Sequence, residues 1–571
     1  MFKEPQGVAG QPAGLQKSHY VRVEPPGTAG AKIETAAPPA AVRVRKVAVI
    51  VTHGMGNQVP FETLQMVADR LLQFAPAPQA GRLPVKVGLV ELNGTQLSRA
   101  ELTIHDKDGI ALDVHMYEAY WAPLTEGKVT ARDAMWFLFM AGLRGIQSSW
   151  GTGEFDRWMF DDWQEFNISH GKLLLVYVVA LLTLAAFLLM NIAIAAATVS
   201  ASKWIDPPLT RIAGDLFGYE WRVFLCLGLG IGLPWVYRSI RSRAPRPAKT
   251  LPRWTGWIST FLVYLTLVLT IWTGLKIGFD IIASNGALLA TPLPGILKIP
   301  ARSGHGIGVV AGWLLGPLPR NAATHISPWF LLVIWALAIT IAYGVRWFLR
   351  QFVGDVAAYV SSYSVSKFDE LRKAIQKTAL DVMQPVYQEE TANSRERRRQ
   401  EAIRGEPRSK KEYEYEEIVA VGHSLGSVIT YDTLNTLINR PQPGDEPLDV
   451  PARTKFLLTF GSPLDKTAFI FRNQRPQSNE VREALAAAMQ PMILSYGFRP
   501  ARWVNIYSPA DWISGSLEFY DPCRLAEQDP VKRVENLLDS EACIPLIAHT
   551  SYWTNDLFGE QLFRAVTSRL Q

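Results

Sequence analysis

The chain contains the segment Ile418-Val419-Ala420-Val421-Gly422-His423-Ser424-Leu425-Gly426. Its first four residues are apolar, as in a buried strand, and the residues from Ser427 to Leu437 are compatible with a helix. The five residues from Gly422 match Gly-x-Ser-x-Gly, in which the glycines leave room for a sharp strand-to-helix turn around the serine. The segment predicts an α/β fold with Ser424 on such a turn, and an ordinary tight turn is the alternative.

Ser424 is therefore a candidate nucleophile. Backbone amides at the start of the following helix favour a developing negative charge. A serine needs a base, usually a histidine oriented by a carboxylate, and after this kind of turn the chain order is Ser, acid, His. His549 is the one histidine of the sequence that follows Ser424. We expect His549 to be the base, and a structural histidine is the alternative.

Three aspartates compete for the role of the acid. Asp511 follows the expected strand 502–507, and Pro509 helps to turn the chain at the carboxyl end of that strand. Asp465 has a similar place after the preceding expected strand, 455–460, and Asp521 lies further along the loop. We expect Asp511 to orient His549 and keep the other two as alternatives.

A tetrahedral intermediate also needs two hydrogen-bond donors. The backbone amide of Leu425, directly after the candidate nucleophile, is the first. An early apolar run, 47–52, leads into His53-Gly54-Met55-Gly56, and the amide of Met55 or Gly54 is expected to be the second donor. The alternative for this loop is a glycine turn after a core strand.

Two segments carry a family resemblance. The run Val421-Gly422-His423-Ser424-Leu425-Gly426-Ser427-Val428-Ile429-Thr430-Tyr431-Asp432 resembles the α/β-hydrolase lipases, in particular the intracellular phospholipases A1 of the DDHD family. The run Val51-Thr52-His53-Gly54-Met55-Gly56 resembles the early glycine loop of that family. The resemblance implies an α/β-hydrolase fold with a mostly parallel sheet and an esterase acting on acyl lipids. We expect neither a cofactor nor a metal ion.

The composition points to a membrane. Only 19% of the 571 residues are charged, against roughly 25% in ordinary soluble domains. Uncharged runs at about 173–199 and 254–275 are long enough to span a bilayer, and a further span is expected at about 326–349. The strand before His53 and the strand before Ser424 must share one sheet, and the expected spans lie between them in the chain. The chain must therefore return to the same side of the membrane, which requires an even number of spans. We therefore expect 223–237 to be the fourth.

The expected topology follows from the basic residues. The loop 238–253 carries a cluster of Lys and Arg, and such clusters favour the cytoplasmic side. This predicts a multi-pass protein of the cytoplasmic membrane with its catalytic domain on the cytoplasmic side. The net charge of +6 is too small to favour nucleic acid as a partner, and three cysteines cannot form a disulfide framework.

The predicted organisation has four parts. They are a disordered tail over 1–42, the first part of an α/β-hydrolase domain over 43–170, a transmembrane insertion of about four spans over 171–350, and the second part of the domain over 351–571. Further strands are expected at 85–92, 100–105 and 111–120, and a helix over 61–74.

The expected function is a membrane-integral serine hydrolase that cleaves acyl esters, most simply a lipase or phospholipase acting on membrane lipids. An acyltransferase, or an esterase for small soluble esters, would use the same three residues. A transport or scaffold protein with a regulatory hydrolase-like domain is the alternative from another class. The oligomeric state stays open.

Overall fold

The computed structural model describes most of the chain outside its middle third. The described residues are 45–56, 58–76, 85–106, 108–130, 133–134, 136–137, 140, five positions between 258 and 268, 354–360, 368–440, 448–467, 489–521, 532–544 and 547–568. The predicted tail 1–42 lies outside them.

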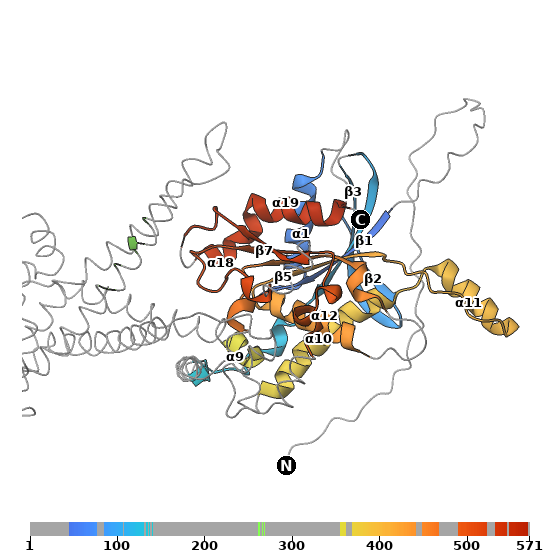
Figure 1. The fold of residues 1–571 in the computed structure, drawn as a ribbon, viewed down its shortest axis with the longest axis horizontal. Helices are drawn as coiled ribbons and strands as arrows, with labels where there is room; N and C mark the ends of the chain where they lie inside the picture. Colours follow the sequence, from blue (N-terminus) through green and yellow to red (C-terminus); the bar gives the residue numbers. More distant parts are fainter. Residues whose placement is uncertain are drawn as a thin grey trace, which may run out of the picture. The chain divides into compact units, whose positions relative to one another are not determined.

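Eight strands form one sheet in the order β2-β3-β4-β1-β5-β6-β7-β8 (Figure 1). The strands are β1 Arg45–Thr52, β2 Lys86–Leu92, β3 Thr95–His105, β4 Ala111–Ala119, β5 Glu417–His423, β6 Thr454–Phe460, β7 Arg502–Tyr507 and β8 Val534–Leu538. The pairings β2–β3 and β3–β4 are antiparallel, and every pairing from β4 to β8 is parallel. The α/β architecture with a mostly parallel sheet is thus present.

The central strand β1 joins two distant parts of the chain. It pairs with β4 on one side and with β5 on the other. Its residues from Val47 to Val51 are completely buried, which explains why this strand is a continuous apolar run rather than an alternating one. Thr52 lies opposite Gly422, so the chain leaves β1 and β5 at the same edge of the sheet.

Helices cover both faces of the sheet. The α-helices are α1 Glu62–Phe74, α9 Gly354–Val360, α10 Asp369–Gln388, α11 Ala392–Arg404, α12 Leu425–Asn439, α13 Val450–Arg453, α16 Pro491–Leu494, α18 Ala548–Ser551 and α19 Asp556–Thr567. Short 3-10 turns are η1 Ala122–Leu124, η5 Tyr496–Phe498, η6 Glu518–Tyr520 and η8 Tyr552–Thr554. In Figure 1 α1 and α19 lie on one face, and α10 and α12 on the other.

Alternate residues of β1 belong to two separate apolar cores. Ala48 and Ile50 belong to the apolar cluster that includes α10 and α12, whereas Val49 and Val51 belong to the cluster that includes α1 and α19. This division follows from the two-residue period of a strand. The sheet is therefore packed on both faces around the strand that leads into the site.

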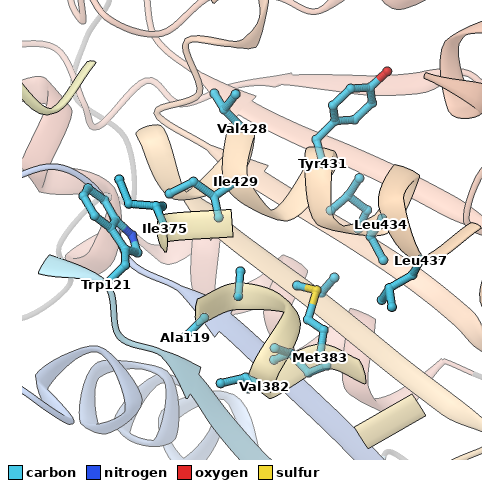
Figure 2. Close-up of a cluster of buried hydrophobic side chains, with 14 of the residues drawn as sticks. Ala119, Trp121, Ile375, Val382, Met383, Val428, Ile429, Tyr431, Leu434 and Leu437 are labelled. Atoms are coloured by element: carbon cyan, nitrogen blue, oxygen red, sulfur yellow. The ribbon is translucent and has the colours of Figure 1, made fainter. Parts of the chain in front are cut away.

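The helix after the Ser424 turn is held by the first of these cores. Figure 2 shows Val428, Ile429 and Leu434 of α12 in a cluster with Met383 of α10 and Trp121 near the end of β4. All five side chains are at most 5% exposed. Because α12 is fixed by this packing, its first residue has a fixed place relative to the sheet.

The predicted fold class needs one correction. Within the described parts of the chain, no helix combines the length and the apolar character needed to cross a membrane. The longest described helix, α10, has 20 residues and would be long enough, but it carries Asp369, Arg372 and Lys377 among other charges. Its buried residues, among them Leu371, Ile375 and Met383, pack in the apolar core against the sheet.

The prediction of an α/β fold interrupted by a transmembrane insertion is contradicted by this finding. We correct the fold class to an α/β fold on a mostly parallel eight-stranded sheet. The expected spans 173–199, 223–237, 254–275 and 326–349 lie outside the described residues, apart from the five positions between 258 and 268.

Candidate functional site

Ser424 occupies the turn between β5 and α12. Its backbone has φ 51° and ψ −130°, a left-handed conformation that costs a non-glycine residue about 1–3 kcal/mol. Two contacts hold it: the Ser424 amide donates to the carbonyl of Phe460 at 3.0 Å, and the hydroxyl of Ser427 donates to the Ser424 carbonyl at 2.5 Å. The surrounding structure therefore maintains the strained turn that the motif predicted.

The two glycines of the motif are required by close backbone contacts. A Cβ atom on Gly422 would lie 2.5 Å from the Cα of Ser427. A Cβ atom on Gly426 would overlap the carbonyl oxygens of Thr52 and His53. The start of α12 is consequently pressed against the end of β1, where the other half of the expected site begins.

His549 and Asp511 meet Ser424 as the sequence predicted. The Nε2 atom of His549, on α18, lies 2.8 Å from Ser424 Oγ, and its Nδ1 atom lies 2.9 Å from Asp511 Oδ2. All three residues are buried. With the proton of His549 on Nδ1, the ring donates to Asp511 and accepts from the Ser424 hydroxyl, which is the arrangement that activates a serine.

The Asp511 carboxylate has further donors. The amide of Ile513 donates to its Oδ1 at 2.9 Å, and the hydroxyl of Tyr552 donates to its Oδ2 at 3.1 Å. Burial by itself would raise the pKa of Asp511, but the hydrogen bond and charge of His549, the amide of Ile513 and the side chain of Ser514 outweigh it and leave that pKa below its usual value. The ionised form of Asp511 is therefore favoured beside His549.

The alternative acids are used elsewhere. Asp465 pairs with Lys466, with Oδ2 3.1 Å from Nζ. Asp521 accepts from Arg499 at 2.6 Å and from the hydroxyl of Tyr496 at 2.8 Å. Of the three aspartates considered, Asp511 is the one that the structure brings to His549.

The loop after β1 lies directly against the serine turn. A Cβ atom on Gly54 would be 2.8 Å from the Cβ of Ser424, so the backbone of Gly54 passes next to the candidate nucleophile. Met55 is buried beside it. Leu425 is the first residue of α12, and the first amides of a helix have no acceptor within the helix. The expected donors, Leu425 with Met55 or Gly54, are therefore placed around Ser424.

His53 holds the backbone of this loop in place. Its Nδ1 lies 2.8 Å from the carbonyl of Gly54, while its Nε2 accepts from the amides of Trp121 at 3.0 Å and Ala122 at 3.3 Å. Burial lowers the pKa of His53 to about 4, against the hydrogen bond to Gly54. Both ring nitrogens of this neutral side chain are thus engaged in holding backbone groups.

A second buried group, Asp355 of α9, holds the end of the same loop. Its Oδ2 accepts from the amide of Gly56 at 2.9 Å. Burial raises the pKa of Asp355 to about 6, although the Gly56 amide and the Thr125 side chain favour its ionised form. The loop beside Ser424 is therefore fixed at one end by His53 and at the other by a carboxyl group from a distant part of the chain.

Sequence reasoning did not identify four of these supporting residues. They are Asp355, Tyr552, Ser514, whose hydroxyl lies 3.0 Å from that of Tyr552, and His423, whose Nε2 donates to the His549 carbonyl at 3.1 Å. Tyr552 follows His549 by one helical turn, which is a signal that could have been used. Nothing in the local sequence marks Asp355, because its partner is Gly56, 299 residues away.

Comparison with known proteins adds no relative. No family model matches the chain, and no curated protein and no solved structure is similar to it at a significant level. In the described ranges, no group of three or more His, Cys, Asp or Glu residues is arranged to bind a metal ion. What the site does must therefore be argued from its own geometry.

Proposed function

We propose that this chain is a serine hydrolase that cleaves acyl esters through a covalent acyl-enzyme. One observation carries the proposal: Ser424 Oγ, on a strained strand-to-helix turn, lies 2.8 Å from His549 Nε2, and His549 Nδ1 lies 2.9 Å from Asp511. Nucleophile, base and orienting acid, in this order of contact, are the groups that acyl transfer to serine requires.

In the proposed reaction, Ser424 Oγ attacks the ester carbonyl carbon while His549 Nε2 takes its proton. The negative oxygen of the tetrahedral intermediate accepts hydrogen bonds from the amide of Leu425 and from Met55 or Gly54. His549 then gives the proton to the departing alcohol, and the acyl group stays on Ser424. A water molecule then attacks the acyl carbon while His549 takes its proton, and His549 passes this proton to Ser424 Oγ as the bond to the acyl group breaks and the carboxylic acid leaves.

We further propose that the acyl group is that of a lipid. Besides the resemblance in the sequence, two exposed apolar residues that are close to Asp511 and His549 in the chain support this choice. Trp512 adjoins Asp511 and is 55% exposed, and Ile547 is two residues before His549 and 43% exposed. Exposed large apolar side chains favour a partner with apolar surface, such as an acyl chain.

Covalent labelling tests the hydrolase. The wild-type protein is treated with a fluorophosphonate probe, and the modified peptide is sequenced by mass spectrometry. We expect one adduct on Ser424, and none in Ser424→Ala or His549→Ala. Ser551→Ala is the matched control, because its hydroxyl donates to the Ala548 carbonyl at 2.9 Å and not to the triad. A folded wild-type protein that does not react, or equal labelling of Ser424→Ala, would refute the proposal.

A series of p-nitrophenyl esters tests the substrate class. We expect kcat/KM to rise as the acyl chain lengthens, and Trp512→Ala to reduce this rise while leaving turnover of the acetate ester within about threefold. A wild-type preference for acetate over long chains would exclude lipid esters and leave a small-ester esterase.

A further inference from the structure

The side chain of His423, directly before Ser424, is enclosed by the parts of the site. Its ring centre lies 5.1 Å from that of His549, 4.9 Å from that of Phe460 and 5.3 Å from that of Trp553. The residue is buried at the end of β5. His423, at the end of the strand that leads to Ser424, therefore contacts the segment that carries His549.

His423 also makes a hydrogen bond of fixed direction. Its Nε2 lies 3.1 Å from the carbonyl oxygen of His549, and a carbonyl can only accept, so the proton of His423 is on Nε2. Burial, followed by the charge of His549, lowers the pKa of His423 to about 3, although the His549 carbonyl and Asp511 act in the opposite direction. The ring stays neutral while His549 gains and loses its proton.

The other edge of the ring faces the loop after β1. A Cβ atom on Gly54 would lie 2.7 Å from Nδ1 of His423, so the ring and the Gly54 backbone are in close contact. Gly461, at the end of β6, approaches from another side, since a Cβ atom there would be 3.2 Å from Nε2. The His423 ring thus contacts both the segment that carries His549 and the loop that contains Gly54.

We propose that His423 is a positioning residue that fixes the main chain of His549 and the Gly54 loop relative to Ser424. It does not touch the reacting atoms and acts through these two segments. The inference rests on the proposed hydrolase function. Its physical basis is that small displacements of reacting groups, of about 1 Å, can lower a rate by about a hundredfold.

Two substitutions separate this role from simple filling of space. His423→Phe keeps an aromatic ring of similar size but removes the donor to the His549 carbonyl. His423→Gln loses the ring but retains an N–H group at a similar distance from the main chain. A residue that only fills the core should be replaced better by Phe, whereas a donor that positions His549 should be replaced better by Gln.

The experiment measures kcat, KM and the rate of fluorophosphonate labelling, each per folded protein, with the melting temperature as a separate readout. We expect His423→Phe to lower kcat and the labelling rate at least tenfold with KM within about threefold, and His423→Gln to recover part of the loss. Wild-type kcat in His423→Phe, or a greater loss in Gln than in Phe, would overturn the inference while leaving labelling of Ser424 intact. Absence of wild-type labelling would instead overturn the proposed function.

A measurement on the wild-type protein covers the case in which these variants do not fold. Nitrogen-15 NMR of the histidine rings reports which ring nitrogen carries the proton. We expect His423 to be protonated at Nε2 and to show no titration between about pH 5 and pH 9. A proton on Nδ1, or titration of His423 in that range, would contradict the hydrogen bond on which the inference depends.

Discussion

The hydroxyl of Tyr552 donates to Asp511 Oδ2 at 3.1 Å, and this is the same oxygen that lies 2.9 Å from His549 Nδ1. The Tyr552 hydroxyl also lies 3.0 Å from Ser514 Oγ. The acid is thus held by a residue only three positions beyond the base. Orientation of the carboxylate and orientation of the imidazole are consequently linked through one short segment.

Removing this hydroxyl should weaken the acid without breaking the triad. In Tyr552→Phe the Asp511 carboxylate loses one donor, so its pKa should rise. Since the pKa of Asp511 is lowered in the folded protein, the stability it contributes is lost as the pH falls, and in the variant this loss should begin at a higher pH. We expect kcat to fall about two- to tenfold. The measurement is kcat as a function of pH, including the acid side of the profile.

Tyr507→Phe is the control. It removes the same hydroxyl group from a tyrosine at the end of β7, the strand that leads towards Asp511. Its substitution should leave both kcat and the acid limb unchanged. Equal behaviour of the two variants would contradict a specific role for Tyr552.

Replacement of the three candidate acids by Asn should give three different results. Asp511→Asn should lower kcat by about 10²–10⁴ because the preferred tautomer of His549 is lost. Asp465→Asn should keep kcat within about threefold. Asp521→Asn should act on the melting temperature instead, because it weakens a buried ion pair with Arg499. A large loss of kcat in Asp465→Asn with a normal rate in Asp511→Asn would reverse our assignment of the acid.

The close contact of Gly54 with the serine turn can be tested by adding one methyl group. In Gly54→Ala the new Cβ would meet His423 Nδ1 at 2.7 Å and Ser424 Cβ at 2.8 Å, so the loop must move away from Ser424. We expect kcat for an ester to fall at least tenfold. Gly88→Ala is the matched control, since a Cβ there meets nothing within 4 Å. If both variants have wild-type kcat, the Gly54 loop does not take part in the reaction.

Asp355 should make the stability of the protein depend on pH in an unusual direction. Its pKa is raised from 3.8 to about 6, so between these values the folded protein holds a proton that the unfolded chain releases. Stability from this group is therefore present at low pH and is lost as the pH rises to about 6. The shift corresponds to about 3 kcal/mol.

Asp355→Asn is uncharged at every pH and should remove this dependence. The difference in unfolding free energy between variant and wild type, from urea titrations at several pH values, should grow in favour of the variant from about pH 4 to pH 7. A difference independent of pH would mean that Asp355 does not titrate in this range.

The arrangement of the triad could be predicted because local rules determine it. The Gly-x-Ser-x-Gly pattern fixes a strand, a turn and a helix, and the order of Ser424, Asp511 and His549 follows from the positions of their strands. Strand β7 has the predicted bounds, 502–507. β5 and β6 are close to their predictions; β5 contains a continuous apolar run, and most residues of β6 are apolar.

Other parts could not be predicted, for physical reasons. Strand β8 is short and mostly half-buried, so its sequence has little apolar signal. The contact of Asp355 with Gly56 joins residues far apart in the chain, and no local pattern encodes it. The transmembrane insertion was inferred from hydropathy, and its fourth span from the need for an even number of spans. Hydropathy measures the preference of a segment for an apolar environment, and it does not distinguish lipid from other apolar surroundings.

The place of β1 in the sheet has a consequence for the synthesis of the protein. β1 and β4 emerge early from the ribosome and can pair at once, but the partner on the other edge of β1 is β5, whose pairing with β1 begins at Glu417. Until then this apolar edge has no strand beside it, and open apolar edges promote aggregation. A truncated chain that ends before β5 should therefore need a chaperone to stay in solution, and full translation is the step that closes the sheet.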